Sequence, residues 1–294
     1  MIAARRRVDL SAITAILPVL ALVPLWLVAL AVFWLPIRMV WHVSFIAFAL
    51  GYLAMAVLLF WRPFQVFVLA PLIGARRPTR DEWSLLDTSW RSVLQANRLP
   101  QGRYVVVVLP SHDLNAFACG GHLVVVTSFA AQTLPRDELT GVLAHELSHH
   151  LGFHTVALSV GQWLSVPVLT LARFGFFLQN VATAAMGSFA RDSAAAAAIG
   201  RLIGVILKSV SWVFLSGLMV SNAIGNAVGR NAEFQADQRA VGMGFGRPLA
   251  MALRRAALVD RAARPLTWRD RIAATHPSAR TRVARIEAQL RVRR

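Results

Sequence analysis

Two histidines and a glutamate stand at the spacing of a metal-dependent hydrolase, in the segment His145-Glu146-Leu147-Ser148-His149. On a helix, residues four apart share one face at a distance of about 5–6 Å, so both imidazoles can reach one metal ion. Glu146 would lie beside that ion, where its carboxylate can take a proton from an attacking water and later give it to the leaving amine. We therefore expect one zinc ion per chain, with His145 and His149 as ligands and Glu146 as the catalytic base.

A suitable third ligand lies further along the chain, in the segment Glu233-Phe-Gln-Ala-Asp237. Glu233 would complete a set of two histidines and one glutamate, a common catalytic zinc site with one position left open for water. Asp237, one helical turn on, is expected to accept a hydrogen bond from the second ring nitrogen of a ligand histidine. We expect the neighbouring His150 and His154 to stay outside the ligand set.

The composition of the chain indicates a membrane protein. Hydrophobic residues make up 56% and charged residues 15% of its 294 residues, with a mean hydropathy of +0.55, whereas soluble domains carry about 25% charged residues. Four apolar runs are long enough to cross a bilayer, namely residues 10–37, 39–61, 155–172 and 209–229. The first is far longer than the apolar part of a signal peptide, so we expect a retained anchor. For the last two runs, buried helices of a soluble domain stay open as the alternative.

The charge of the chain is strongly positive, with 31 Lys+Arg against 14 Asp+Glu. All the basic residues except Lys208 are arginines. Such a bias has the form of a genome-wide codon preference, so we expect no nucleic-acid partner. The single Cys119 excludes a disulfide bond within the chain.

The distribution of these basic residues predicts an orientation. With four spans, the N-terminus, residues 62–154 and residues 230–294 lie on one side, and they hold 26 of the 31 basic residues. The positive-inside rule places this side in the cytoplasm. We therefore expect a multi-pass protein of the inner or plasma membrane with its catalytic part facing the cytoplasm. His149 and Glu233 then share one side, because the two runs between them cross the bilayer twice.

The remaining segments predict the elements that position the site. We expect an interfacial extension over 63–75, an amphipathic helix over 81–96, and strands over 104–109 and 122–127 joined by a polar loop. Pro135, with Asp137 and Glu138 in the first turn, opens a helix that runs through His149 and on towards the next apolar run. Two further helices are expected, over 248–263 and after Pro277.

These elements predict a mainly α membrane protein with four transmembrane helices and a cytoplasmic zincin-like (gluzincin) α+β domain containing a small β-sheet or hairpin. We expect an N-terminal transmembrane hairpin with its extension over 1–75 and a catalytic part with the His-Glu-x-x-His helix over 76–154. A second transmembrane hairpin is expected over 155–229, and a second catalytic part, with the third ligand and the C-terminal helices, over 230–294.

Four motifs in this order resemble a known family. They are His145-Glu146-x-x-His149, Glu233-x-x-Ala-Asp237, Asn115-Ala116-Phe117 before a valine-rich strand, and Thr275-His276-Pro277-Ser278 near the C-terminus. The pattern resembles the M48 family of membrane zinc metallopeptidases, and within it the bacterial HtpX-like heat-shock proteases more than the larger Ste24 branch, which acts on prenylated proteins.

The resemblance implies roles for further residues. Asn115, Ala116 and Phe117 would begin an edge strand that pairs with an extended substrate backbone, although a plain hairpin loop stays open. His276 would donate to the scissile carbonyl, with a helix-capping role as the alternative. Arg282 would pair with the acids Glu233 and Asp237.

We therefore expect a membrane-bound zinc metalloendopeptidase that cleaves misfolded or membrane-associated proteins at the cytoplasmic face. Its partners would be protein or peptide substrates and the lipid bilayer. One alternative is a catalytically inactive membrane scaffold that keeps the fold, which the intact Glu146 disfavours. The other is a Ste24-like processor of lipidated C-terminal tails, which the short chain disfavours.

Overall fold

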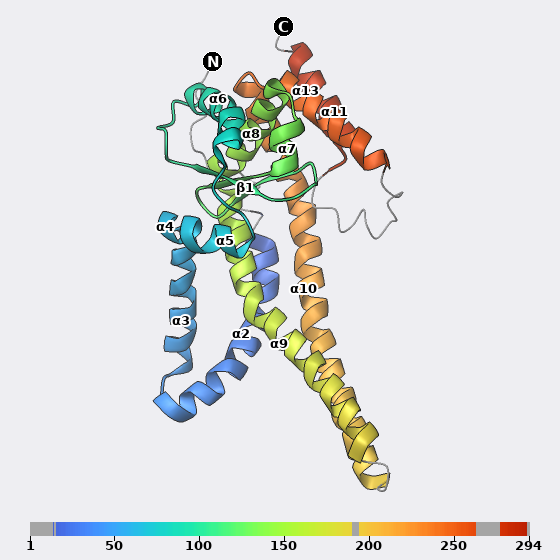
Figure 1. Cartoon of the computed structure of the whole chain (residues 1–294). Helices are drawn as coiled ribbons and strands as arrows, with labels where there is room; N and C mark the ends of the chain where they lie inside the picture. The colour runs from blue at the N-terminus through green and yellow to red at the C-terminus, as the bar shows by residue number, and fades with distance from the viewer. Residues whose placement is uncertain (1–13, 15, 190–193, 263–276, 293–294) are drawn as a thin grey trace. The chain divides into compact units, whose positions relative to one another are not determined.

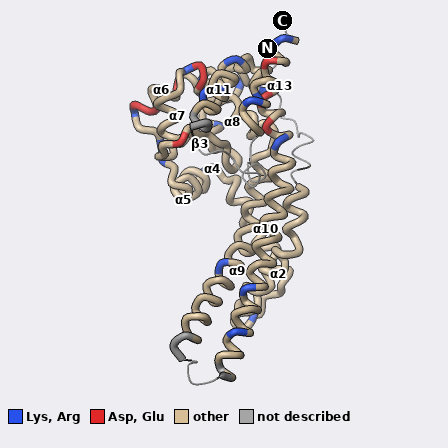
Figure 2. Tube along the Cα trace, turned by 90° about the vertical axis from the view of Figure 1, so that its right-hand side faces the viewer, with Lys and Arg blue, Asp and Glu red and all other residues tan. Residues whose placement is uncertain are grey.

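The computed structural model describes residue 14 and residues 16–189, 194–262 and 277–292 (Figure 1). The chain forms two compact units. The first comprises the described parts of Met1–Ile16, Met55–Ser159 and Asn226–Arg294, and the second comprises Leu17–Ala54 and Val160–Gly225. Among the described residues, aspartate and glutamate occur only in the first unit (Figure 2).

The second unit is built from long apolar helices. They are α2 (Ile16–Trp41), α3 (Phe45–Met55), α9 (His154–Phe189) from Val160 onward and α10 (Ala194–Gly242) up to Gly225. Its core joins side chains of four helical segments, including Leu22, Trp26, Leu164, Val168, Phe214 and Leu218. Tyr52 and Trp163 each donate a side-chain hydrogen bond to the backbone carbonyl of the other, at 2.7 and 3.0 Å.

Three of the described helices, α2, α9 and α10, are long and apolar enough to cross a membrane. There is a fourth span only if two helical stretches joined at a bend, Phe45–Phe60 and Arg62–Leu72, are taken together as a single membrane span. The two limbs of this pair differ in direction by 76°. The second expected span, over 39–61, is therefore divided in the structure: α2 continues to Trp41, and α3 begins at Phe45. The total of four spans stays a prediction.

The part of the bent pair that follows α3 belongs to the first unit and consists of short helical segments. These are η1 (Ala56–Phe60), α4 (Arg62–Phe64), the π-helical segment η2 (Gln65–Leu69) and α5 (Ala70–Leu72). Trp61 lies at the break with an extended backbone (φ −80°, ψ 117°). Pro63 lies two residues further on and has no backbone N–H to continue the hydrogen-bond pattern of the preceding helix.

A three-stranded mixed sheet forms the centre of the first unit. Its strands β1 (Val105–Leu109), β3 (Leu123–Thr127) and β2 (Ala116–Cys119) lie in the order β1-β3-β2, with β1 parallel and β2 antiparallel to β3. The two valine-rich runs are buried on both faces, which explains their lack of alternation. The residue pattern predicted β1 and β3 with a polar loop between them, whereas the family resemblance implied an edge strand beginning at Asn115-Ala116-Phe117, and the structure has this strand as β2.

Several helices form a common core with one face of this sheet. They include α6 (Arg80–Ala96), α7 (Ser128–Thr133), α8 (Arg136–Leu151), α11 (Gly246–Ala262) and α13 (Ala279–Val292), of which α7 and α8 contact its strands directly. Thr79 and Glu82 form a capping box at the start of α6. The expected helices over 81–96 and 248–263 and those after Pro135 and Pro277 are confirmed.

Helix α8 packs very closely on α11 and ends sooner than expected. A Cβ atom added at Gly141 would lie 2.3 Å from the backbone nitrogen of Leu249, so only glycine allows this approach. The ion pair between Glu138 and Arg255 joins the same two helices at 2.7 Å. The expected continuation of α8 into the apolar run is wrong: α8 ends at Leu151, Gly152 caps it, and Phe153 adopts a left-handed conformation (φ 61°) before α9 begins.

Candidate metal centre

The structure brings His145, His149 and Glu233 together within the first unit. The two Nε2 atoms are 3.2 Å apart, and they lie 3.2 Å (His149) and 3.4 Å (His145) from the Glu233 carboxylate oxygens. Ligands about 2.0–2.1 Å from a tetrahedral zinc ion lie about 3.3 Å from one another. The donor types and their separations therefore fit one zinc ion, and these residues form the one such cluster found among the described residues.

Two helices position the residues of the site, and on each helix the two residues are four positions apart. His145 and His149 lie one turn apart on α8, and Glu233 and Asp237 lie one turn apart on α10. Three of the four side chains are almost fully buried, and the His149 side chain is 12% exposed. The site thus lies between α8 and α10 and is largely buried, and only the His149 side chain is partly exposed.

Asp237 fixes the orientation of His145. The Asp237 carboxylate lies 3.0 Å from Nδ1 of His145, which leaves Nε2 facing His149 and Glu233. Burial and the Arg282 charge act to lower the pKa of His145, but hydrogen bonds to Asp237 and Glu233 outweigh them and raise it to about 9. The surroundings therefore favour a positive charge at this point, which a divalent cation would supply in place of the proton.

Arg282 joins α13 to the ligand helix α10. It donates to both carboxylate oxygens of Asp237, at 2.9 and 2.7 Å, and lies 3.0 Å from a Glu233 oxygen. Arg282 is itself 6% exposed, so its guanidinium and the two carboxylates form a buried ion-pair network.

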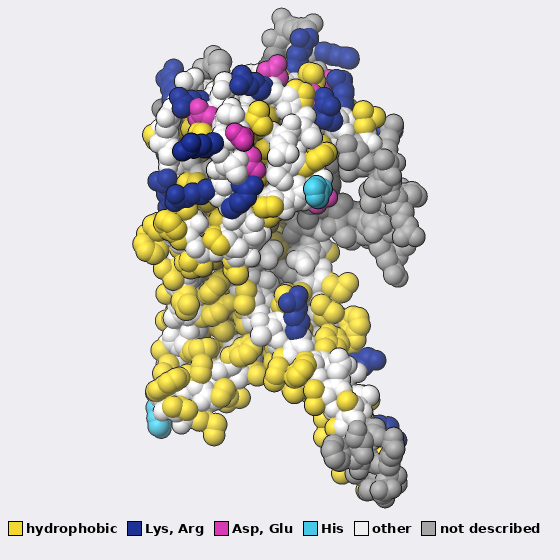
Figure 3. All heavy atoms as spheres, viewed as in Figure 1, with side chains coloured by type: hydrophobic (Ala, Val, Ile, Leu, Met, Phe, Trp, Pro, Cys, Tyr) yellow, Lys and Arg dark blue, Asp and Glu magenta, His cyan; other side chains and the backbone are white. Residues whose placement is uncertain are grey.

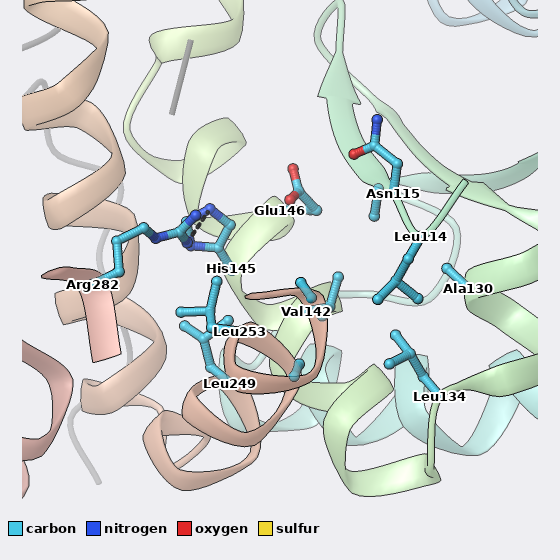
Figure 4. Close-up of a pocket in the computed structure, with 13 residues that line it drawn as sticks. Leu114, Asn115, Ala130, Leu134, Val142, His145, Glu146, Leu249, Leu253 and Arg282 are labelled. Atoms are coloured by element: carbon cyan, nitrogen blue, oxygen red, sulfur yellow. Dashed lines mark hydrogen bonds between the residues drawn. The ribbon is translucent and has the colours of Figure 1, made fainter. Parts of the chain in front are cut away.

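Glu146 faces a cavity of about 140 Å³ beside the metal cluster (Figure 4). Asn115 contributes to the same cavity from the residue before β2. Most of the remaining wall is apolar and comes from α7, α8 and α11 and from the chain before β2, through Leu114, Ala130, Val142, Leu249 and Leu253. Glu146 is thus positioned between the two candidate ligand histidines and an apolar cavity.

The edge strand β2 begins at Ala116 and Phe117, and Asn115 directly precedes it. Ala116 pairs with Val126 of β3, and β2 has its second side at the edge of the described sheet. The Thr127 hydroxyl accepts from the Asn115 amide and donates to the Asp113 carbonyl, which fixes the turn into the strand. His276, the expected carbonyl donor, lies outside the described residues.

Sequence reasoning missed the apolar wall of the cavity and the role of His150. Val142 precedes Glu146 by one helical turn, and Leu249 and Leu253 lie one turn apart on a predicted helix, so their spacing was a usable signal. His150 is buried, and its Nε2 donates to the Leu123 carbonyl at 2.8 Å, which ties the metal-binding helix to the central strand.

Comparisons with known proteins agree with this geometry. The profile of peptidase family M48 matches residues 83–290. A Protease HtpX homolog of Acidiphilium cryptum is 31% identical over 207 residues, which cover 62% of this chain and 66% of that protein. A Protease HtpX homolog of Thermococcus sibiricus is 26% identical over 182 residues, covering 60% and 58%.

A similar fold is found in the crystal structure of S. mikatae Ste24p. The TM-score is 0.55 at 18% sequence identity, and the match covers 87% of this chain and 61% of that one. At this identity the likeness concerns the fold alone. The matched parts span less than two thirds of the length of each of these relatives.

Proposed function

The chain belongs to peptidase family M48, as its motifs led us to expect, and we propose on this basis that it is a membrane-bound zinc metalloendopeptidase. The observation that carries the proposal is the position of Glu146. Its carboxylate adjoins a ligand set of two histidines and one glutamate and lines the same cavity as Asn115. A purely structural metal site has no use for a carboxylate placed in this way.

When bound, zinc supplies the Lewis acidity that polarises a carbonyl and activates water near neutral pH. Glu146 accepts the proton of the attacking water and returns it to the leaving amine, so one carboxylate serves both half-steps. We assign the hydrogen bond to the developing oxyanion to His276 from its motif. A donor of this kind contributes about 10²–10³ in rate.

The substrate is proposed to be an extended polypeptide. Its backbone would pair with the edge of β2 at Ala116 and Phe117, as in other cases of strand addition. The apolar cavity would hold one hydrophobic side chain next to the cleaved bond, through contacts with Val142, Leu249 and Leu253. Misfolded and membrane-associated proteins expose such segments, and the arginine distribution supports a site on the cytoplasmic face.

Metal dependence tests the proposal. The full chain, purified in detergent, would be treated with a chelator and assayed for casein cleavage before and after stoichiometric Zn²⁺, with Mg²⁺ as the control ion. We expect cleavage to disappear with the metal and to return with Zn²⁺ alone. Zinc-loaded protein that cleaves neither casein nor a set of hydrophobic peptides would contradict the proposal, as would cleavage that persists without metal.

A further inference from the structure

The short segment after the break at Trp61 is apolar on two opposite faces. Its inner face, formed by Val66, Leu69 and Ala70, packs on the sheet. The partners are side chains on the sheet face away from α8, including Val107, Leu123 and Val125. This inner face belongs to the folded core of the first unit, so the segment cannot leave the sheet without exposing that core.

The outer face of the same segment carries large apolar side chains that nothing in the described structure covers. Phe67 is 68% exposed, Val68 46% and Leu72 78%, and Trp61 at the break is 59% exposed. Hydrophobic atoms gather over α4, η2 and α5 in Figure 3, directly below a group of basic side chains. A contiguous apolar surface of this kind marks a site of association.

Length and charge indicate what covers it. Arg62–Leu72 would extend only about 16 Å as a helix, far less than the roughly 30 Å of a hydrocarbon core, so it does not span. Arg62 is exposed at its start and Arg77 is exposed five residues after its end, and the Arg77 guanidinium lies 5.7 Å from the centre of the Phe67 ring. Apolar side chains bordered by tryptophan and arginine are typical of a helix in the interface of an anionic bilayer.

Gln65 joins this segment to the substrate-binding hairpin. It is fully buried, donates from Nε2 to the Leu59 carbonyl and accepts at Oε1 from the His122 amide at 3.0 Å. The turn between β2 and β3 lies against it, because a Cβ atom at Gly120 (φ 60°) would come within 2.8 Å of the amide. One side chain thus holds together the break in the helix, the outer segment and the hairpin turn.

We infer that Arg62–Leu72 lies in the headgroup region of an anionic bilayer, with Phe67, Val68 and Leu72 among the acyl chains, and that Gln65 fixes the β2–β3 hairpin to it. The edge strand is thereby held at the membrane surface. Given the proposed function, β2 would receive polypeptide that emerges from the bilayer. The placement of the segment itself does not depend on peptidase activity.

Spin-label accessibility tests the membrane placement. Single cysteines would be introduced at Val68 and Leu72 in a Cys119→Ser background, with Ser84→Cys on the exposed face of α6 as the control. The full chain would be reconstituted in vesicles of phosphatidylcholine and phosphatidylglycerol. We expect labels at 68 and 72 to be reached by oxygen several-fold better than by a water-soluble nickel complex, at about 5–10 Å below the phosphates. The label at 84 should show the reverse preference.

Three results would overturn the placement. Labels at 68 and 72 that behave like the label at 84 would mean that the face lies in water. A depth near the bilayer centre would mean a re-entrant segment. Strong dipolar coupling between labels of different molecules, with poor access for both reagents, would mean that a second copy of the chain covers the face.

Hydrogen–deuterium exchange tests the role of Gln65. In Gln65→Ala, exchange over residues 116–123 should rise about tenfold, because the His122 amide loses its buried acceptor. Gln95→Ala on the exposed surface of α6 is the matched control and should leave this exchange unchanged. Equal exchange in the two variants would overturn the coupling, whether or not the protein proves to be a peptidase.

Discussion

Removal of Arg282 should destabilise the first unit strongly. Arg282→Met keeps most of the side-chain volume but leaves the buried carboxylates of Asp237 and Glu233 without the guanidinium that faces them at 2.7–3.0 Å. Breaking a buried ion pair from one side costs about 3–5 kcal/mol. For a folded unit of this size, that corresponds to a decrease in Tm of about 6–20 °C.

Thermal unfolding in detergent with excess chelator measures this decrease, because a bound cation would also neutralise Glu233 and mask part of the loss. Arg280→Met is the matched control, since Arg280 lies exposed on the same helix. The Tm of Arg282→Lys should lie between those of Arg282→Met and Arg280→Met, because lysine keeps the charge but cannot bond both Asp237 oxygens at once. A Tm for Arg282→Met within about 2 °C of the control would refute the argument that this network stabilises the site.

Three further predictions concern the ligand set, the helix cap and the α8–α11 contact. Glu233→Gln should lower the zinc content below one per chain after dialysis against a weak chelator, since two histidines form an incomplete site; full retention, measured by atomic absorption, would assign the third ligand elsewhere. Arg76, against the cost of burial, holds the pKa of Glu82 at about 2 instead of 4.5, so this carboxylate stabilises the fold above pH 4.5 and loses its effect as the pH falls towards 2. Glu82→Gln should therefore cost about 1–2 kcal/mol at pH 7 and little near pH 2, and a Tm difference that is the same at both pH values would contradict this. Gly141→Ala should cost about 1–3 kcal/mol, because the added Cβ meets the Leu249 backbone at 2.3 Å; an unchanged Tm would show that α11 moves freely.

The metal cluster could be predicted from sequence because its geometry is local to two helices. The spacing of His145 and His149 fixes their common face, and the spacing of Glu233 and Asp237 does the same on the second helix. The sequence spacing alone does not predict that these two helices pack against each other. The expectation that His149 and Glu233 lie on the same side of the membrane made this packing possible but did not require it. The observed separations of 3.2–3.4 Å between the three ligands are consistent with this reasoning.

Features that depend on tertiary contacts were not predictable in this way. Strand β2 exists because Ala116–Cys119 pairs with β3, and its own residues carry little strand signal. The apolar cavity wall depends on the approach of Leu249 to Gly141, two residues far apart in sequence. The end of α8 is different, because Gly152 was a visible stop signal, although the residue that takes the left-handed conformation is the next one, Phe153.

Glu146 is the proton carrier of the proposed zinc peptidase, and Glu146→Gln tests this role most directly. Zinc content and casein cleavage would be measured on the same samples of wild type, Glu146→Gln and Asp137→Asn, an exposed position on the same helix. We expect Glu146→Gln to retain one zinc per chain and to lose cleavage by several orders of magnitude, while Asp137→Asn matches wild type. A zinc-loaded Glu146→Gln that cleaves casein at the wild-type rate would contradict the account.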